Sequence, residues 1–391
     1  MSIEIVAQKI DNQLHAAVLK GGSVTDLYVD SKEAFPLWGS IYLGTVDKID
    51  KALDVAFINI GGNQQGILPL KHIYKAGLDS RTEKITSLLN PGETVIVQVK
   101  AEGRHKTPFE NRKLPRLTMK LYLPGRLLSY SPTANKVTVS RQVSNEDVFR
   151  IAQELKTQGG WIIRSAAENA DPLALEAEAK ILRALWATLQ DMRRDKPGTP
   201  RLLHKGPNAV CRALIDYASQ AVNRIEMTEN SQPDSVRKWC DDHIPDLGDR
   251  LIISPEHKVD LFEMHDIHQI IEEALERYVP LPHGGSLIIE ETHAMTVVDL
   301  NRGDGGDIKT VNLEAAKEIV RQLRIRNISG ALLVDFISMR LRSDRYDLIS
   351  NLEKMLEDDP GNTQVHGFTR LGIMEITRTR RTGCLLEKYK S

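Results

Sequence analysis

The stretch from Ser286 to Met339 constrains the fold more than any other part of this chain. It holds two short apolar runs, Leu287–Ile289 and Met295–Val298, then a helical pattern, then a third apolar run, Ala331–Val334. Short apolar runs bounded by turn residues predict buried strands. The order strand, helix, strand predicts a crossover unit that sets parallel strands side by side or one strand apart. We therefore expect an α/β sheet here.

The helix of this unit is expected to begin at Asn312. Asn312 is a good N-cap residue, and Glu314 in the first turn suits the helix dipole. Four apolar residues recur at helical spacing: Leu313, Ala316, Val320 and Leu323. Ser329–Gly330 then breaks the helix before the last strand.

Two acids stand at the ends of predicted strands. Asp299 follows one apolar run and Asp335 follows another, and ligands of α/β sheets bind beyond the carboxyl ends of strands. Two converging carboxylates repel each other unless a cation joins them, and hard oxygen ligands suit Mg²⁺. Asn301, two residues past Asp299, could add a neutral amide. Alternatively, each Asp merely caps its strand or pairs with a nearby Arg.

Composition limits the kinds of partner. The 391 residues suffice for two or more domains, and a net charge of −1 excludes a uniformly cationic coat for nucleic acid. Basic residues are locally in excess near the end of the chain: Arg370, Arg378, Arg380, Arg381, Lys388 and Lys390. Such a cluster suits a polyanion, although a solvated basic face is the commoner explanation.

Cysteine usage and hydropathy indicate the compartment. The three cysteines are scattered and form no CxxC pair, which argues against disulfides or a thiolate zinc site. No signal peptide or membrane-length apolar run is evident in the sequence. We expect a soluble protein of the cytoplasm.

The first 120 residues predict two groups of strands. Residues 1–37 contain three short strands, too few to bury a core alone, so this piece should join a later segment. From Gly39, five short strands with glycine turns are typical of a small Greek-key barrel of the OB type. Such barrels bind single-stranded nucleic acid through exposed aromatics and cations. Tyr42 and Phe57 are the candidate aromatics, although Phe57 could equally be a core residue. Candidate cations lie near the loops: Lys71, Lys106, Arg112, Lys113 and Arg116.

The middle of the chain predicts more helix. Asp171–Pro172 should start a long amphipathic helix that runs to about Arg194. Asn208–Met227 is also expected to be helical, and Ser254–Pro255 to cap a helix that runs to about Arg277. Arg164–Ser165 follows a predicted strand and could grip a phosphate, although a structural role is the simpler explanation.

Several blocks of sequence resemble the ribonuclease E/G family of bacterial endoribonucleases. They are GSIYLGTV, AFINIGGNQQGILPLK, PRLTMKLYLPGR, GWIIRSAA, LPHGGSLIIEETHAMTVVDLN, NLEAAKEIVRQLRIRN, ALLVDFISM and LGIMEITRTR. The resemblance implies a composite α/β (α+β mixed) fold. A ribonuclease-H-like subdomain would be split between 1–38 and 207–278. An S1 (OB-fold) RNA-binding barrel at 39–120 and a 5′-sensor region at 121–206 would be inserted, and a DNase-I-like catalytic subdomain would occupy 279–391.

The resemblance also implies roles for residues. Asp299 and Asp335 would hold Mg²⁺ (or Mn²⁺), with Asn301 assisting. Arg164–Ser165 would recognise the 5′-monophosphate of RNA, and Phe57 would stack on a base. The remaining residues expected to contact RNA are Tyr42, Lys106, Arg112, Lys113, Arg370, Arg378 and Arg380.

The chain departs from the family pattern in four places, one of which is a short loop between Asn301 and Asn312. Ile67 replaces the second aromatic of the S1 face, and Leu114 replaces a glycine before the PRLT block. The CPxC zinc-link motif is missing, with only Cys384 near its place. We therefore expect no structural zinc, and a monomer or weak dimer rather than a zinc-linked dimer or tetramer.

These features predict an endoribonuclease. It would cut single-stranded RNA with Mg²⁺, in rRNA or tRNA processing or in mRNA decay, and favour 5′-monophosphorylated ends. Its products would carry 5′-phosphate and 3′-hydroxyl ends. The alternatives are a non-catalytic RNA-binding regulator derived from the same fold and a phosphodiesterase acting on DNA.

Overall fold

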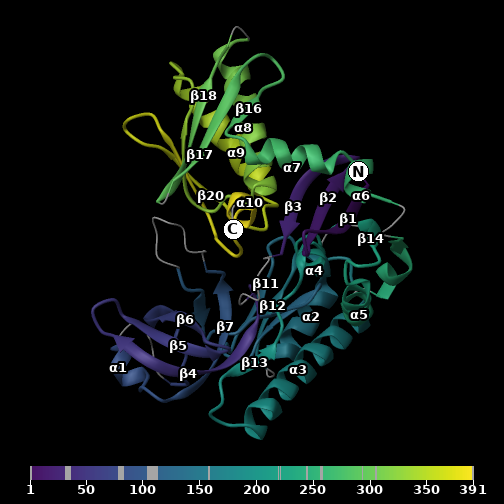
Figure 1. Cartoon of the computed structure of the whole chain (residues 1–391), viewed down its shortest axis with the longest axis vertical. Helices are drawn as coiled ribbons and strands as arrows, with labels where there is room; N and C mark the ends of the chain where they lie inside the picture. The colour runs from purple at the N-terminus through teal and green to yellow at the C-terminus, as the bar shows by residue number, and fades with distance from the viewer. Residues whose placement is uncertain are drawn as a thin grey trace.

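The computed structural model of the chain describes residues 2–30, 37–77, 83–103, 113–156, 159–218, 220, 222–243, 245–255, 259–292, 294–303 and 306–389. Within these ranges the protein is a mixed α/β structure with four sheets, one of which closes as a five-stranded barrel. Figure 1 shows the C-terminal sheet at one end of the molecule, the barrel at the other, and the N-terminal strands between them. The mixed α/β class is confirmed, while the subdomain boundaries stay a prediction.

The N-terminal strands are completed by strands from much later in the chain. The sheet has the order β15-β14-β1-β2-β3, in which β14 is parallel to both β1 and β15. Its strands are β1 (Ile3–Ile10), β2 (Gln13–Lys20), β3 (Ser23–Val29), β14 (Val222–Thr228) and β15 (Leu251–Ser254). Three helices pack on one face: α4 (Ala209–Asp216), α5 (Pro233–His243) and η4 (Pro245–Arg250). On the other face lie α6 (Leu261–Met264), α7 (Ile267–Leu275) and α10 (Leu385–Tyr389).

Two helix predictions in this part were wrong. Asn208–Met227 is not one helix, because α4 ends at Asp216 and Val222–Thr228 is the strand β14. Partners on both sides stabilise β14 as a strand, which local propensity does not reveal. Ser254 ends β15 rather than capping a helix, and the two helices that follow begin after Asp260, whose side chain caps α6.

The barrel is built from the strands that the glycine turns predicted. Its order is β4-β5-β6-β8-β7, and pairing of β4 with β7 closes it, while β13 adds to the free edge of β4. The elements are β4 (Ile41–Asp50), β5 (Val55–Gly61), β6 (Gln64–Pro69), η1 (Leu70–His72), α1 (Ile85–Leu88), β7 (Thr94–Ala101), β8 (Arg116–Thr118) and β13 (Arg201–His204).

A small sheet and two helices follow the barrel. The sheet has the order β11-β12-β10-β9, and α2 and α3 pack with it around Trp161 and its neighbours. The elements are β9 (Leu123–Pro124), β10 (Leu128–Ser131), β11 (Val137–Val139), α2 (Glu146–Leu155), β12 (Gly160–Ile163), η3 (Ser165–Ala167) and α3 (Pro172–Asp195). Asp171 caps α3 and Pro172 occupies its first turn, as the sequence predicted.

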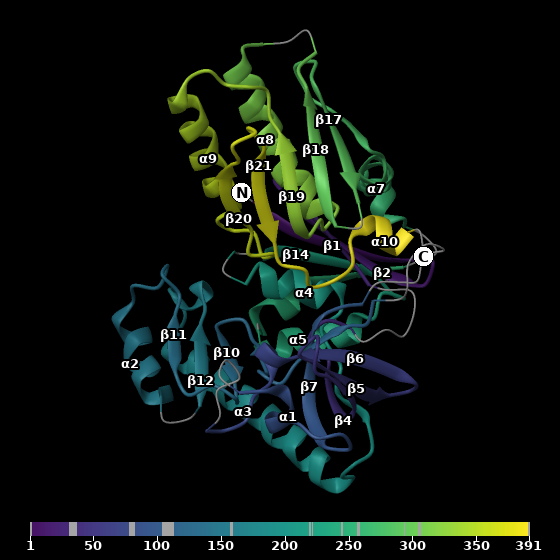
Figure 2. The ribbon, with the colours of Figure 1, turned by 90° about the vertical axis from the view of Figure 1, so that its left-hand side faces the viewer.

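Among the described residues, the helices that pack on the C-terminal sheet lie on one of its faces. Its order is β16-β17-β18-β19-β21-β20, and α8 and α9 pack against one side to form the largest apolar cluster described. The elements are β16 (Tyr278–Pro280), β17 (Ser286–Glu291), β18 (Met295–Asn301), α8 (Ile308–Ile325), β19 (Gly330–Asp335), α9 (Arg342–Leu356), β20 (Gln364–Phe368) and β21 (Met374–Arg378). Figure 2 looks onto these strands and shows the barrel below them.

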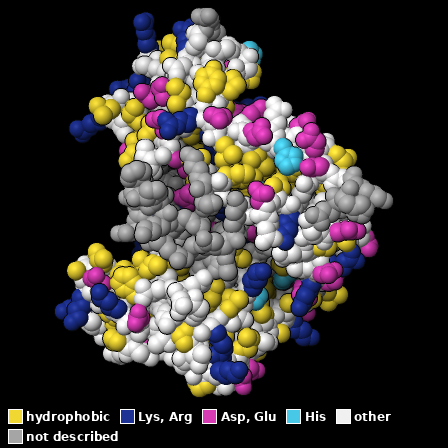
Figure 3. Space-filling view, in the orientation of Figure 1, with side chains coloured by type: hydrophobic (Ala, Val, Ile, Leu, Met, Phe, Trp, Pro, Cys, Tyr) yellow, Lys and Arg dark blue, Asp and Glu magenta, His cyan; other side chains and the backbone are white. Residues whose placement is uncertain are grey.

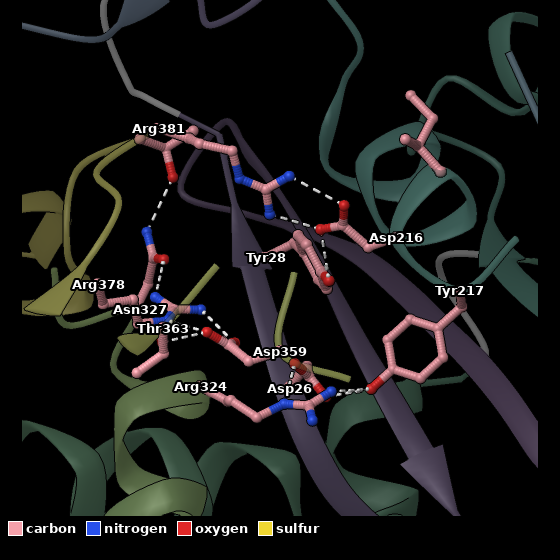
Figure 4. A network of polar contacts seen from close by, with 12 residues as sticks. Asp26, Tyr28, Asp216, Tyr217, Arg324, Asn327, Asp359, Thr363, Arg378 and Arg381 are labelled. Atoms are coloured by element: carbon pink, nitrogen blue, oxygen red, sulfur yellow. Dashed lines mark hydrogen bonds and ion pairs between the residues drawn. The ribbon is translucent and has the colours of Figure 1, made fainter. Parts of the chain in front are cut away.

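Buried ion pairs join the C-terminal sheet to the N-terminal one (Figure 4). Arg324 of α8 donates two hydrogen bonds to Asp26 of β3, at 2.8 and 2.9 Å. Arg381 donates two to Asp216 at the end of α4, at 2.9 and 2.6 Å. These contacts hold the two sheets in one arrangement, because breaking one partner of such a pair leaves a buried charge uncompensated.

Candidate active site

The two aspartates predicted to converge lie directly opposite each other. β18 and β19 are adjacent parallel strands, and Asp299 is the register partner of Asp335. The preceding partners, Val298 and Val334, are both buried in the core with α8. Side chains alternate along a strand, so both aspartates project from the opposite, open face, from strands about 4.8 Å apart. The predicted juxtaposition is therefore present.

The amide of Asn301 lies beside the pair. Two residues after Asp299 on the same strand, Asn301 projects from the same face, and its Nδ2 donates to Asp299 Oδ2 at 3.4 Å. All three side chains are exposed. The group therefore faces solvent and is open to a ligand.

A buried asparagine in α8 fixes the chain just after Asp335. Asn312 is fully buried; its Nδ2 donates to the carbonyl of Ile337 at 2.8 Å, and its Oδ1 accepts from the amide of Ile337 at 3.0 Å. The prediction that Asn312 caps the helix was wrong, since α8 begins at Ile308 with Asp307 as its N-cap. Asn312 instead anchors the segment that carries Asp335.

The donor set of this site suits a divalent cation held in part by substrate. Neither Asp299 nor Asp335 forms an ion pair with a basic side chain within the described ranges. Nor do the described residues contain a group of three His, Cys, Asp or Glu side chains able to hold a metal. Two carboxylates and one amide leave coordination positions for water and phosphate oxygens, which is how proteins commonly hold Mg²⁺.

The barrel presents one predicted aromatic on its surface and buries the other. Phe57 is half-buried and alternates with the core residues Ala56 and Ile58, so its ring lies on the outer face. Tyr42 is only 8% exposed and belongs to the barrel core. The prediction that Tyr42 contacts RNA is therefore wrong, because its ring is not available to a base.

Phe57 belongs to a row of side chains across the barrel. It pairs with Lys48 on β4 and with Ile67 on β6, and Ile67 pairs in turn with Arg116 on β8. The row thus places one aromatic and one apolar side chain between two cations. This combination suits bases and phosphates of a single strand.

The basic residues near the end of the chain have different surroundings. Arg378 is 7% exposed and pairs with Asp359 through two hydrogen bonds of 2.9 and 3.0 Å. Burial acts to raise the pKa of Asp359, but Arg378 outweighs it and holds that pKa below its usual value. Arg378 is therefore structural, and its predicted contact with RNA was wrong. Arg380 pairs with Glu387 at 3.1 and 2.7 Å, whereas Arg370 is exposed.

Of the two residues predicted to recognise a 5′-phosphate, Arg164 and Ser165, only Ser165 lines a pocket. The two terminal nitrogens of Arg164 donate to the carbonyls of Gly125 and Ile215, both at 2.6 Å. Ser165 begins η3 and lines a pocket of about 380 Å³ together with Arg126. Of the predicted barrel cations, Lys113 is exposed, while Lys106 and Arg112 lie outside the described residues.

Charge on the visible surface is mixed. Figure 3 shows basic and acidic side chains interspersed over both ends of this face of the molecule, in keeping with the net charge of −1. A nucleic acid must therefore be bound by a local group of cations rather than by the whole face. No helix in the part that the structure describes is long and apolar enough to cross a membrane.

Known proteins are similar in sequence to this chain. The model of the ribonuclease E/G family matches residues 122–381. Ribonuclease G of Escherichia coli strain K12 is 30% identical over 97% of this chain and 80% of that protein. Ribonuclease E of Synechocystis sp. is 33% identical over 90% of this chain and 53% of that protein. Ribonuclease G of Haemophilus influenzae is 29% identical over 97% of this chain.

The chain therefore belongs to the ribonuclease E/G family, as its motifs predicted. Membership of this family indicates an endoribonuclease.

Proposed function

We propose that the protein is a divalent-metal-dependent endoribonuclease that cuts single-stranded RNA and leaves 5′-phosphate and 3′-hydroxyl ends. The observation that carries the proposal is the register of Asp299 with Asp335 on an open sheet face. Two carboxylates so close together repel each other, and a shared cation would remove that repulsion. RNA binding alone gives no reason to place two carboxylates beside a polyanion.

Each part of the site has a task in this proposal. Asp299 and Asp335 would hold Mg²⁺, and Asn301 would orient Asp299 and contact the scissile phosphate group. When bound, the cation would supply an activated water and screen the negative charge of the transition state. Asn312 would keep Asp335 in position through the backbone of Ile337.

The barrel would deliver an unpaired strand. Phe57 can stack only on a base that is free of a helix, and the neighbouring Lys48 and Arg116 can meet its phosphates. OB-type barrels accept DNA as well as RNA, so the preference for RNA is proposed from the relatives, which are named as ribonucleases. A preference for 5′-monophosphorylated ends is proposed from Ser165 and the cationic Arg126 at one pocket.

The experiment compares three substrates and two proteins. A 5′-monophosphorylated single-stranded RNA, the same RNA in a duplex and the equivalent DNA are incubated with Mg²⁺ and with wild type or Asp299→Asn. We expect cleavage of the single-stranded RNA alone, lost in the variant. Tight binding by wild type without cleavage would contradict the nuclease proposal and support an RNA-binding regulator. Equal cleavage of DNA would contradict the proposed preference for RNA.

The proposed end preference needs its own substrate. A 5′-triphosphorylated copy of the same RNA should be cut more slowly than the monophosphorylated one. The Ser165→Ala variant should reduce that difference without lowering the rate on the triphosphorylated RNA. Equal rates on both RNAs with wild type would end the sensor proposal and leave the nuclease proposal intact.

A further inference from the structure

A basic pocket lies between the barrel and the C-terminal sheet, apart from the aspartate pair. Its volume is about 1070 Å³. On the barrel side it is lined by η1, the end of β7 and the strand β8; on the other side it reaches Ala294, Gly330 and Thr379, at the beginnings of β18 and β19 and the end of β21. Asp299 and Asp335 stand at the opposite ends of β18 and β19.

Five cations that line this pocket form no ion pair within the described part of the chain. They are Lys71, Lys100, Lys113, Arg116 and Lys120. All five are exposed, and the Nζ of Lys120 donates to the backbone carbonyl of Lys71 at 2.7 Å rather than to an acid. Cations that are not paired with acids raise the local positive potential, which attracts a polyanion.

The excess of positive charge also affects the pKa values of two groups at the pocket, His72 and Lys100. Burial, together with the four surrounding cations Lys100, Lys71, Lys120 and Arg116, lowers the pKa of His72 to about 4. Burial and the neighbouring Lys71, Arg116 and Lys120 also lower the pKa of Lys100. Burial is the larger cause of both shifts, and the contribution of the cations shows that like charges lie close together in the pocket wall.

Glu102, the one acid among the described residues that line the pocket, is already engaged. Glu102 accepts hydrogen bonds from the backbone amides of Trp38 at 3.1 Å and Gly383 at 3.4 Å, and its carboxylate lies 4.0 Å from the buried Nζ of Lys388. Its negative charge therefore stabilises the contact between the barrel and the C-terminal segment. It does not neutralise the five cations.

Two lining residues, Arg116 and Gly330, lie on strands that also carry parts of the proposed site. Arg116 belongs to the pocket and pairs in register with Ile67, beside Phe57 on the outer barrel face. On the sheet side, Gly330 lies next to Ala331, which shares the open face with Asp335 four residues later, about 13 Å at the ordinary rise of a strand. A strand of RNA can span this distance with a few nucleotides.

We propose that this pocket binds backbone phosphates of the RNA a few nucleotides from the scissile bond and so sets which bond reaches the aspartates. The inference rests on the proposed function. It adds a phosphate subsite formed chiefly by Lys71, Lys100 and Lys120, of which only Lys71 was a candidate cation in the sequence. Recognition there depends on charge and not on base identity.

The first test measures binding without cleavage. Single-stranded RNA is titrated against Asp299→Asn protein with and without Lys71→Gln/Lys100→Gln, at several salt concentrations. We expect the double substitution to weaken binding about tenfold near 0.1 M salt and to reduce the slope of log K against log salt by about 1.4, for two lost contacts on a single strand. The matched control is Lys180→Gln, an exposed lysine on α3, which should change neither value.

Folding and site specificity are checked separately. Removing two like charges should leave the melting temperature of the double variant equal to or above that of wild type.

In active protein, a neutral methylphosphonate placed two to four linkages from the scissile bond, on one side of it, should reduce wild-type affinity severalfold and have little effect on the double variant. An unchanged salt slope in the double variant would overturn the subsite even if wild type cuts RNA. A wild type that binds RNA through the pocket but does not cut it would instead overturn the proposed function.

Discussion

At the scale of single residues, the partners of a charged side chain decide whether it is available to RNA. Arg378 and Arg370 are eight positions apart, yet Arg378 is buried in an ion pair with Asp359 while Arg370 is exposed. In the sequence they belong to one basic cluster, because nothing local shows that Asp359 will fold against Arg378. In contrast, the juxtaposition of Asp299 and Asp335 was predicted correctly, because their place at the ends of predicted strands is itself local information.

The two barrel aromatics allow a direct comparison at this scale. Phe57→Ala should weaken the binding of single-stranded RNA by about 1–3 kcal/mol, the usual value of one stacked base, with little change in stability. Tyr42→Ala should instead lower the free energy of unfolding by about 3–5 kcal/mol, because it empties part of the barrel core. Fluorescence titration with RNA and urea denaturation measure the two effects. Equal effects of both substitutions on RNA binding would contradict this assignment.

At the scale of elements, the crossover β18–α8–β19 was predicted from its periodicity, and the barrel strands from their glycine turns. The features that were not predicted from the sequence depend on pairing between strands that are far apart in the chain. Val222–Thr228 becomes the strand β14 because β1 and β15 flank it, and a bulge in β4 near Val46 contributes to which side chains face the core. Neither cause is visible in a local window of sequence.

The anchor from α8 to the segment after Asp335 leads to a prediction about activity. Asn312→Ala leaves the amide and carbonyl of Ile337 without their partner, which should cost about 2–4 kcal/mol of stability. Displacement of Asp335 should also lower kcat at least tenfold. Denaturation curves and single-turnover cleavage measure these effects. The control is Asn351→Ala on the exposed side of α9, which should leave cleavage unchanged; an unchanged kcat in Asn312→Ala would contradict the positioning role.

At the scale of the whole molecule, the C-terminal segment ties the parts together. Arg381 binds Asp216, its guanidinium lies 5.0 Å from the ring centre of Trp38, and α10 packs against α7. These contacts place the open face of the C-terminal sheet and the barrel on the same side of the molecule (Figure 2). The sequence predicted a split N-terminal piece that must join a later segment, but not that the last residues would complete its core.

One of these long-range contacts should make stability depend on pH. His15 of β2 is buried between the carbonyl of Gln13 at 3.1 Å and the hydroxyl of Tyr389 in α10 at 2.9 Å. Burial lowers its pKa from 6.5 to about 4. Between these values the unfolded chain binds the proton more readily than the folded one. The free energy of unfolding should therefore fall as pH falls from 6.5 to 4, by about 3 kcal/mol from this residue.

The variant His15→Gln isolates that contribution. It should lower stability at pH 7.5 and flatten the decline between pH 6.5 and 4, as measured by urea denaturation at several pH values. Part of the decline should remain, because the pKa of His72 is also lowered to about 4. A decline as steep as that of wild type would show that His15 does not carry the effect.

The most direct test of the account is the rate of RNA cleavage as a function of Mg²⁺ concentration in wild type, Asp299→Asn, Asp335→Asn and the double variant. If the two carboxylates share one cation, each single substitution should lower the rate at saturating RNA by at least about 10³-fold, and the double variant should be little worse than either. Melting temperatures should stay equal or rise, because a like-charge pair is removed. Cleavage by either single variant at the wild-type rate and Mg²⁺ dependence would contradict the assignment of the site.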